Sequence, residues 1–523
     1  MKVFCKTCYD YIFGKRRVKV RLVICLVMVN GLFIFSRLPF FLYYPLPITA
    51  PDTATYFWQL EKMEQGMWPT FEFRTPGYPF FWWLCRRISY NILFVIYAQS
   101  ALTLFCINLI LLLLRKYSHQ YIVPAAFSLA VHMSSPMHLA MDMFLLTESV
   151  FVNYMLLFFL FLYLALHSRN VIFAVLSSVM ATAVLYTRPN GAFLIPILAI
   201  SIFYVWWHQY GRKVLLGFVT PVAVGLIGLS SYNAATNGFF GLSGGQEWAM
   251  LWSTAIYLEP DAGLPDEINQ AIEAKSAKIS NVHKEIIFHS WDLNSFRRII
   301  EHNIWDAIVP IASITGGPGL TPKSYLDQRG LMRKIYWTAI QQHPEVYFKN
   351  FLGTFIEYFM MIRTTAWGDF YSYFPAEQYR ATFVDRAFYV EGLKDYYNPK
   401  LPPQFRVIDS TDGIKQVIAN PHKLTSWYSK YTKIRAKVFE NIFWIVPIII
   451  GISVSLYQLL RRRYITIDNF FVLLMIFCLI CHALISALIG HVEERYSYTL
   501  EFVNYLLFPV LPIALSASKQ CKV

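Results

Sequence analysis

Charge is scarce in this sequence: Asp, Glu, Lys and Arg make up 15% of its 523 residues, against 56% hydrophobic residues and 17% aromatic ones. A composition so poor in charge excludes an ordinary soluble domain and predicts an all-α polytopic membrane protein. The chain also lacks a G-x-x-x-x-G-K-[ST] loop and a G-x-G-x-x-G turn in the right setting, so no nucleotide site is predicted. It has no low-complexity tract and no internal repeat, and the lack of a repeat argues against a transporter built from two matching halves.

Cysteines are few and scattered, eight in all. Cys5 and Cys8 form one C-x-x-C in the basic N-terminus, with no second pair at the spacing of a zinc site. Cys478 and Cys481 lie inside an apolar run, where they are expected to pack between helices. We therefore assign no disulfide and no metal site.

The formal net charge of +14 comes largely from basic residues gathered in short gaps between apolar runs. These gaps hold Lys15–Arg17 with Lys19 and Arg21, Arg115–Lys116, Arg212–Lys213 and Arg461–Arg463. Positive charge beside membrane helices marks the cytoplasmic side, so we interpret the excess as topology and expect no nucleic-acid partner.

Apolar runs long enough to span the bilayer, or nearly so, organise the chain. They lie at about residues 22–45, 92–114, 121–140, 144–166, 170–187, 191–210, 214–232, 438–460, 467–490 and 498–517. Allowing for missed runs, we expect a bundle of about 10–13 membrane helices, with interfacial helices and an outer segment. Four parts follow, namely a cytoplasmic N-terminus (1–21), a membrane module (22–232), an outer segment (233–437) and C-terminal membrane helices (438–523).

A cytoplasmic N-terminus places the basic gaps inside and four other parts outside. The outer parts are a loop at 46–91, a short loop at 141–143, the turn at Arg188 and the segment 233–437. Arg37 is expected to snorkel to the membrane surface. The pair Arg86–Arg87 falls outside against the trend, which suggests that the hydrophobic stretch before it is an interfacial helix.

The outer segment is too long for a structureless loop, so it is expected to fold as a domain or as a set of surface helices. Helical stretches of mixed charge run from about 265 to 308, and TGGPG at 315–319 marks a turn. His343-Pro344 opens an amphipathic helix near 344–362 that is expected to lie along the membrane.

Two aspartates in the outer parts are candidate catalytic acids. Asp52 follows the first apolar run, where it could cap a starting helix or take a proton from an acceptor hydroxyl. Asp142 lies between two apolar runs, as a site acid or as an ordinary loop residue.

Cationic and aromatic groups on the same side are candidates for binding. Arg74 and Tyr78 stand in the turn sequence RTPGYP, and Arg188 stands in YTRPNG without a basic neighbour. A guanidinium can clamp a phosphate with two hydrogen bonds, although Arg188 could equally snorkel at the headgroup level. Glu148 lies in an apolar stretch, where it faces either a polar cavity or a stabilising partner.

A last charged cluster, His491-Val-Glu493-Glu494-Arg495-Tyr496, falls between the last two predicted spans. It is either a solvated turn or part of the same outer cavity, and we include Glu494, Arg495 and Tyr496 among the candidate binding residues. The topology count places all of these candidates on one side of the membrane.

The set of motifs resembles the polyprenyl-phosphate-dependent glycosyltransferases of the GT-C fold, in particular bacterial relatives of protein O-mannosyltransferases and aminoarabinose transferases. The resemblance rests on Asp52, the RTPGYP turn, Asp142 with LTES, TRP at Arg188, the His-Pro helix and Glu494-Arg495-Tyr496. It covers the membrane part of the chain. Many relatives have two acids in the first loop where this chain has Asp52-Thr53, so a metal-binding acid pair is not supported.

The resemblance implies an inverting enzyme with its site on the outer face of the membrane. We expect a bacterial inner membrane with the site facing the periplasm, and an endoplasmic reticulum membrane with the site facing the lumen stays open. The enzyme would move a sugar from a polyprenyl-phosphate carrier to a glycan, lipid or protein. Asp52 would be the general base, Asp142 a second acid or an organiser of the site, and Arg74 a ligand of the carrier phosphate. The leaving group is a phosphate monoester, so arginines could stabilise it without a divalent metal, and no cofactor is expected.

Two alternatives stay open. Acids and arginines at membrane depth could line the path of a transporter or flippase for lipid-linked saccharides. A polysaccharide polymerase or ligase would also combine many spans with a large outer segment, but it would use a diphosphate-linked donor.

Overall fold

A computed structural model describes residues 18–43, 51–67, 74–91, 93–117, 119–134, 136–315, 322–363 and 467–489, with a few residues between 449 and 460. The described residues form helices and no strand, as predicted for an all-α membrane protein. The predicted span 498–517 and most of the predicted span 438–460 lie outside the described residues.

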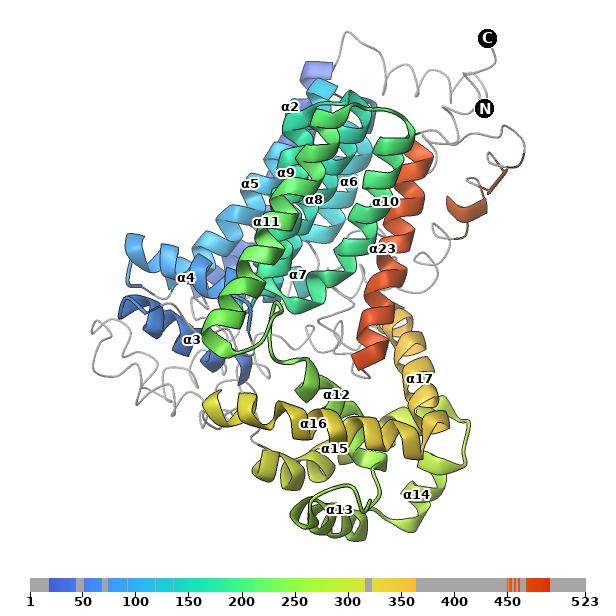
Figure 1. The fold of residues 1–523 in the computed structure, drawn as a ribbon. Coiled ribbons are helices and arrows are strands. Elements are labelled where there is room, and N and C mark those ends of the chain that lie inside the picture. Colours follow the sequence, from blue (N-terminus) through green and yellow to red (C-terminus); the bar gives the residue numbers. More distant parts are fainter. Residues whose placement is uncertain are drawn as a thin grey trace.

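Within the described residues, six helices are long and apolar enough to cross a membrane. They are α2 (Val18–Tyr43), α5 (Leu93–Tyr117), α8 (Glu148–Ser168), α10 (Leu194–Trp207) with the short helix η3 (Pro189–Phe193) before it, α11 (Arg212–Asn237) and α23 (Ile467–Ile489). Two shorter apolar helices, α6 (Ile122–Met133) and α9 (Val171–Thr187), complete the bundle in Figure 1. The protein is therefore a polytopic helical membrane protein.

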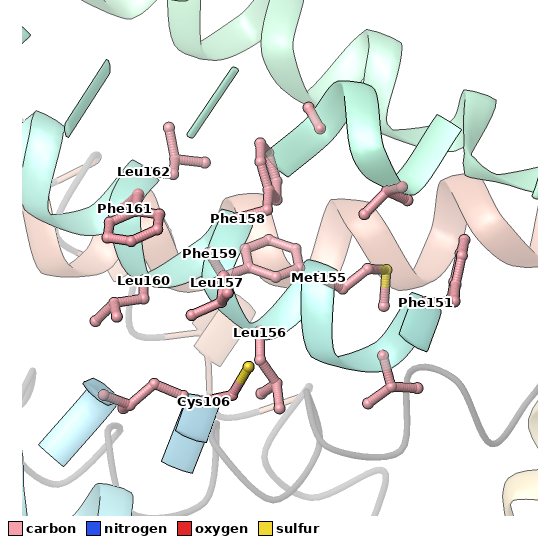
Figure 2. Close-up of a cluster of buried hydrophobic side chains, with 14 of the residues drawn as sticks. Cys106, Phe151, Met155, Leu156, Leu157, Phe158, Phe159, Leu160, Phe161 and Leu162 are labelled. Atoms are coloured by element: carbon pink, nitrogen blue, oxygen red, sulfur yellow. The ribbon is translucent and has the colours of Figure 1, made fainter. Parts of the chain in front are cut away.

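Helix α8 lies at the centre of the bundle. Nearly all of its side chains are buried, because apolar residues occupy every face of it and other helices surround it. Figure 2 shows the resulting core, in which residues from Phe151 to Leu162 pack with Cys106 of α5. A helix buried on all sides holds both of its ends in fixed positions, and the N-terminal end of α8 begins with Glu148.

Helices α9 and α11 approach each other closely through small residues. Gly217 lies against Ala174, and Gly225 lies against Thr182, where a methyl group would meet a side-chain carbon. The Tyr186 hydroxyl donates a 2.6 Å hydrogen bond to the Gly225 carbonyl oxygen. Small residues at a membrane-helix contact allow such tight packing, and here it holds the end of α9 that leads to Arg188.

The two ends of the bundle differ in charge and in the helices that lie beside them. Arg115, Lys116, Arg169, Arg212 and Lys213 all stand at the connections of one end, as the positive-inside pattern predicts. The opposite end carries α3 (Pro51–Glu64), α4 (Gly77–Ile88), α7 (Pro136–Met143) and a separate helical domain (Figure 1).

That outer domain contains α12 (Gln246–Thr254), η4 (Ala255–Tyr257), α13 (Asp266–Lys278), α14 (Asn281–Phe288), α15 (Leu293–Thr315), α16 (Pro322–Gln342) and α17 (Pro344–Arg363). Its apolar side chains form a core of their own. Glu247 of α12 ties the domain together by accepting hydrogen bonds from Arg329 at 2.6 Å and Arg333 at 2.8 Å, both on α16. The predicted helical stretch at 265–308 is confirmed. Of the predicted turn at 315–319, Thr315 ends α15 and the other residues lie outside the described residues.

Three expectations about shape were wrong. The run at 121–140 is not one helix, because α6 ends at Met133 and α7 starts at Pro136. Asp142 therefore lies in a helix, fully buried, and not in an outer loop. Arg37 does not snorkel, since its side chain is buried against Asp142. Helix α17 does begin at Pro344, and it packs against the outer end of α23.

Candidate functional site

The first turn of α3 lies against the segment between α7 and α8. Helix α3 begins at Pro51, a residue that suits the first position of a helix, so Asp52 lies inside its first turn and not before it. The Thr53 hydroxyl donates a 3.1 Å hydrogen bond to the Leu145 carbonyl oxygen. This bond places the backbone of Asp52 beside the segment that leads to Glu148; the side chain of Asp52 lies outside the described residues.

The turn that carries Arg74 lies against the end of α9. A methyl group on Gly77 would come within 2.6 Å of the Tyr186 carbonyl oxygen and 2.7 Å of the Thr187 amide nitrogen, so only glycine permits this contact. The next residue after Thr187 is Arg188. The close approach at Gly77 therefore places the turn that carries Arg74 beside the backbone that leads to Arg188, more than a hundred residues later in the sequence.

Arg74 is held on the surface of this junction. Its Nε donates a 3.1 Å hydrogen bond to the Thr55 hydroxyl, and its guanidinium lies 5.1 Å from the centre of the Tyr56 ring. Both partners belong to α3, so the helix that contains Asp52 also orients Arg74. The side chain is partly exposed, as a group that binds a ligand has to be.

Arg188 forms an ion pair with Glu148. Arg188 Nη1 lies 2.8 Å from Glu148 Oε1, and the Arg188 side chain keeps 11% of its surface exposed while Glu148 is buried. Arg188 is thus tied to a carboxylate and does not simply snorkel to the headgroups. A guanidinium fixed through one of its N–H groups keeps its planar fork in a defined orientation.

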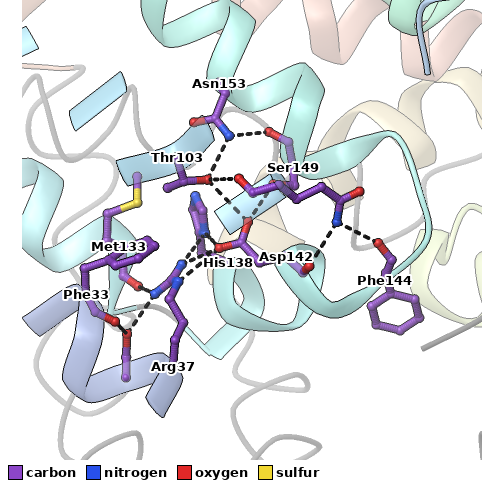
Figure 3. A network of polar contacts seen from close by, with 11 residues as sticks. Phe33, Arg37, Thr103, Met133, His138, Asp142, Phe144, Ser149 and Asn153 are labelled. Atoms are coloured by element: carbon purple, nitrogen blue, oxygen red, sulfur yellow. Dashed lines mark hydrogen bonds and ion pairs between the residues drawn. The ribbon is translucent and has the colours of Figure 1, made fainter. Parts of the chain in front are cut away.

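Asp142 is the centre of a buried polar network shown in Figure 3. Its Oδ2 accepts hydrogen bonds from Arg37 Nε at 3.0 Å and Arg37 Nη2 at 2.7 Å. Its Oδ1 accepts a 2.5 Å bond from the Ser149 hydroxyl and a 3.4 Å bond from the Thr103 hydroxyl. His138 lies near the same carboxylate oxygen as Arg37, with its Nδ1 at 3.5 Å from Asp142 Oδ2. These contacts join α2, α5, α7 and α8.

The neighbours of Asp142 also keep it ionised. Burial alone would raise the pKa of this carboxyl, but His138 and Arg37 outweigh burial and hold the pKa below its ordinary value. A carboxylate with two basic neighbours and two hydroxyl donors is stabilised as an anion and is a poor proton acceptor. Asp142 therefore joins four helices as a buried anion, and its part in the reaction stays a prediction.

Tyr78 links this network to the arginine turn. Its hydroxyl donates a 2.8 Å hydrogen bond to Gln99 Oε1, and its side chain is fully buried. Gln99 Nε2 in turn donates to the carbonyl oxygens of Asp142 at 2.9 Å and Phe144 at 3.0 Å. These bonds fix α4 against α5 and α7, and the role of Tyr78 in binding substrate stays a prediction.

Several members of the network were not assigned a role from the sequence. They are Gln99, Thr103, His138, Ser149 and Asn153, of which Asn153 donates a 2.8 Å bond to the Thr103 hydroxyl. The sequence feature that could have identified them is a polar residue inside an otherwise apolar run, because an unpartnered polar group is costly there.

The predicted residues near the C-terminus cannot be placed relative to this network. Glu494, Arg495 and Tyr496 lie outside the described residues. Among the described side chains, no three of His, Cys, Asp and Glu converge as metal ligands would.

Comparison with known proteins gives little further guidance. No protein-family model matches the chain, and no curated protein matches its sequence. Among solved structures, the chain is similar to ArnT from Cupriavidus metallidurans bound to undecaprenyl phosphate, at 14% sequence identity and a TM-score of 0.34. The match covers 94% of this chain and 78% of that one. A similarity this low leaves the function to be argued from the site.

Proposed function

We propose that this protein is a glycosyltransferase that moves a sugar from a polyprenyl-phosphate carrier to an acceptor at the outer end of the helix bundle. The observation that carries the proposal is the contact at Gly77, which joins the Arg74 turn to the end of α9 at Arg188. Two guanidinium groups at the mouth of a membrane bundle suit a phosphate anchored by an apolar chain. The ion pair with Glu148 limits the excess of positive charge when no phosphate is bound.

In this proposal Asp52 is the general base. It lies in the first turn of α3, one residue before the Thr53 bond to Leu145 and three residues before the Thr55 contact with Arg74. Its carboxylate would take the proton from the acceptor hydroxyl as that oxygen attacks the sugar carbon. The sugar–phosphate bond breaks on the opposite face of that carbon, and the configuration is inverted.

The arginines would stabilise the departing lipid phosphate. Charge builds up on the phosphate oxygen as its bond to the sugar breaks, and fixed guanidinium groups stabilise that charge without reorganising. A phosphate monoester carries less charge than a nucleotide diphosphate, so the proposed reaction assigns no role to a metal ion. We propose that the site faces the periplasm of a bacterial inner membrane, opposite the end that carries Arg115, Arg169 and Arg212.

The test is transfer of labelled sugar from a panel of polyprenyl-phosphate donors by purified protein, with and without a chelator. We expect Asp52→Asn to abolish turnover while donor binding persists, and we expect wild-type activity to survive chelation. Asp266→Asn is the matched control, because Asp266 also lies in the first turn of a helix, in the outer domain. Equal turnover by wild type and Asp52→Asn would leave Asp52 with a helix-stabilising role only. Transfer solely from diphosphate-linked donors would favour the polymerase or ligase, and no transfer at all would favour the transporter.

A further inference from the structure

Helix α17 of the outer domain reaches the membrane bundle through a buried pair of polar side chains. The Tyr358 hydroxyl lies 2.6 Å from His482 Nδ1 of α23, and both side chains are buried. A hydroxyl and an imidazole buried in an apolar contact are costly when separated. The position of α17 on α23 is therefore fixed at this point.

His482 continues the contact toward the candidate site. Its ring meets the ring of Phe193 edge to face, with centroids 4.7 Å apart. Phe193 meets Phe151 in the same way at 6.4 Å, and the Arg188 guanidinium lies 5.8 Å from the centre of the Phe151 ring. An unbroken series of ring contacts thus runs from the outer domain to Arg188.

The backbone around Arg188 has little room to absorb a shift. Phe193 is the last residue of η3, the short helix that begins directly after Arg188. Gly191 in the middle of η3 is pressed against α9, since a methyl group there would meet Val184 at 3.0 Å. Helix η3 is therefore held between α9 on one side and His482 on the other, so we expect a displacement of His482 to move Arg188.

We infer that Tyr358 and His482 are positioning residues through which the outer domain holds Arg188 in the orientation that binds phosphate. This inference rests on the proposed function, from which it takes the phosphate-binding role of Arg188. The contacts between Tyr358, His482 and Arg188 do not depend on that function. Tyr358→Phe removes the hydroxyl and keeps the ring, so it loosens this connection with the smallest change in volume.

The experiment measures modification of Arg188 by phenylglyoxal, a reagent for guanidinium groups, and needs no substrate. In purified full-length protein we expect Tyr358→Phe and His482→Gln each to raise the rate of Arg188 modification by roughly threefold or more. Arg333 of α16, which is 58% exposed and pairs with Glu247 of α12, serves as an internal reference and is expected to react at an unchanged rate. Tyr347→Phe is the matched control, because the Tyr347 hydroxyl also bonds from α17 to α23, but at the Leu488 carbonyl oxygen and not at His482 Nδ1.

Binding of a polyprenyl monophosphate to the same variants separates the two proposals. Faster Arg188 modification together with weaker lipid binding supports both. Faster modification in a protein whose wild type binds no lipid phosphate supports the positioning role and rejects the proposed function. Unchanged Arg188 modification in both folded variants overturns the inference, and so does a parallel rise at Arg333, which would indicate general loosening.

Discussion

Arg37 and Asp142 form an ion pair that is almost completely shielded from solvent. Their side chains are 1% and 0% exposed, and Arg37 Nη2 lies 2.7 Å from Asp142 Oδ2. Arg37 Nη1 donates to the Ser36 hydroxyl at 2.7 Å and the Met133 carbonyl oxygen at 2.8 Å, and Arg37 Nη2 also lies 2.9 Å from His138 Nδ1. The pair joins α2 to α7 and so fixes the segment from Asp142 to Glu148.

Breaking this pair from one side is expected to destabilise the protein strongly. Asp142→Asn leaves the Arg37 charge buried without its counter-charge, at a cost of about 3–5 kcal/mol. Unfolding in detergent, followed by circular dichroism, measures the loss. The matched control is Glu64→Gln, which breaks the more exposed pair between Glu64 and Arg86 at 2.9 Å and is expected to cost roughly 0–1 kcal/mol. Similar losses in the two variants would contradict the importance assigned to burial.

Removal of the Arg188 guanidinium is expected to weaken binding of a polyprenyl monophosphate. Arg188→Ala loses charge-assisted hydrogen bonds worth about 1.5–3 kcal/mol, a drop of roughly 10- to 150-fold in affinity. Arg188→Lys keeps the charge but loses the planar fork, so its affinity is expected to lie between those of wild type and Arg188→Ala. Arg169→Ala, at the opposite end of the bundle, is the control and is expected to bind as wild type does. Binding by Arg188→Ala at wild-type strength would remove Arg188 from the proposed site.

The close contact at Gly77 predicts a sensitive position. In Gly77→Ala the new methyl group meets backbone atoms of Tyr186 and Thr187, so α4 has to move away from α9. We expect a loss of roughly 1–3 kcal/mol in stability and weaker donor binding, because Arg74 moves with the turn. Gly31→Ala in α2 is the comparison, since nothing lies within 4 Å of its methyl group and alanine favours a helix. Equal donor binding by both alanine variants would show that the contact at Gly77 does not determine the position of Arg74 in the proposed site.

A buried lysine predicts a pH dependence of stability. Lys275 of α13 donates hydrogen bonds to the carbonyl oxygens of Ala255 at 2.9 Å, Ile256 at 3.1 Å and Leu258 at 2.8 Å. Burial lowers its pKa from 10.5 to about 7, with Glu259 opposing part of the shift. Between pH 7 and 10.5 the unfolded chain binds this proton and the folded chain does not, so raising the pH stabilises the fold.

The measurement is the unfolding midpoint of the full chain at pH 7 and at pH 9. We expect the midpoint to rise with pH in wild type, and to rise less in Lys275→Met, which has no titrating group at this position. Lys278→Met, which removes an exposed lysine of the same helix, is expected to keep the wild-type slope. A Lys275→Met slope equal to that of wild type would assign the pH dependence to other groups.

Much of the architecture follows from the sequence because membrane helices are specified locally. A run of about 20 apolar residues is sufficient to predict a span, and basic gaps such as Arg212–Lys213 orient it. Local signals also identified α13 and α17, the latter by the proline at its start. The break between α6 and α7 was missed, because the serines and the single proline around Pro136 interrupt an otherwise apolar run only briefly.

The sequence by itself determined the class of the protein, its orientation pattern and the types of residue that could bind a phosphate. Only the tertiary structure decided the partners: Arg37 with Asp142, Arg188 with Glu148, and the Arg74 turn with the end of α9. These partners lie from 40 to more than 100 positions apart, and no local pattern encodes such contacts. They arise because each buried charge and hydroxyl needs a partner, and helix packing determines which one it finds.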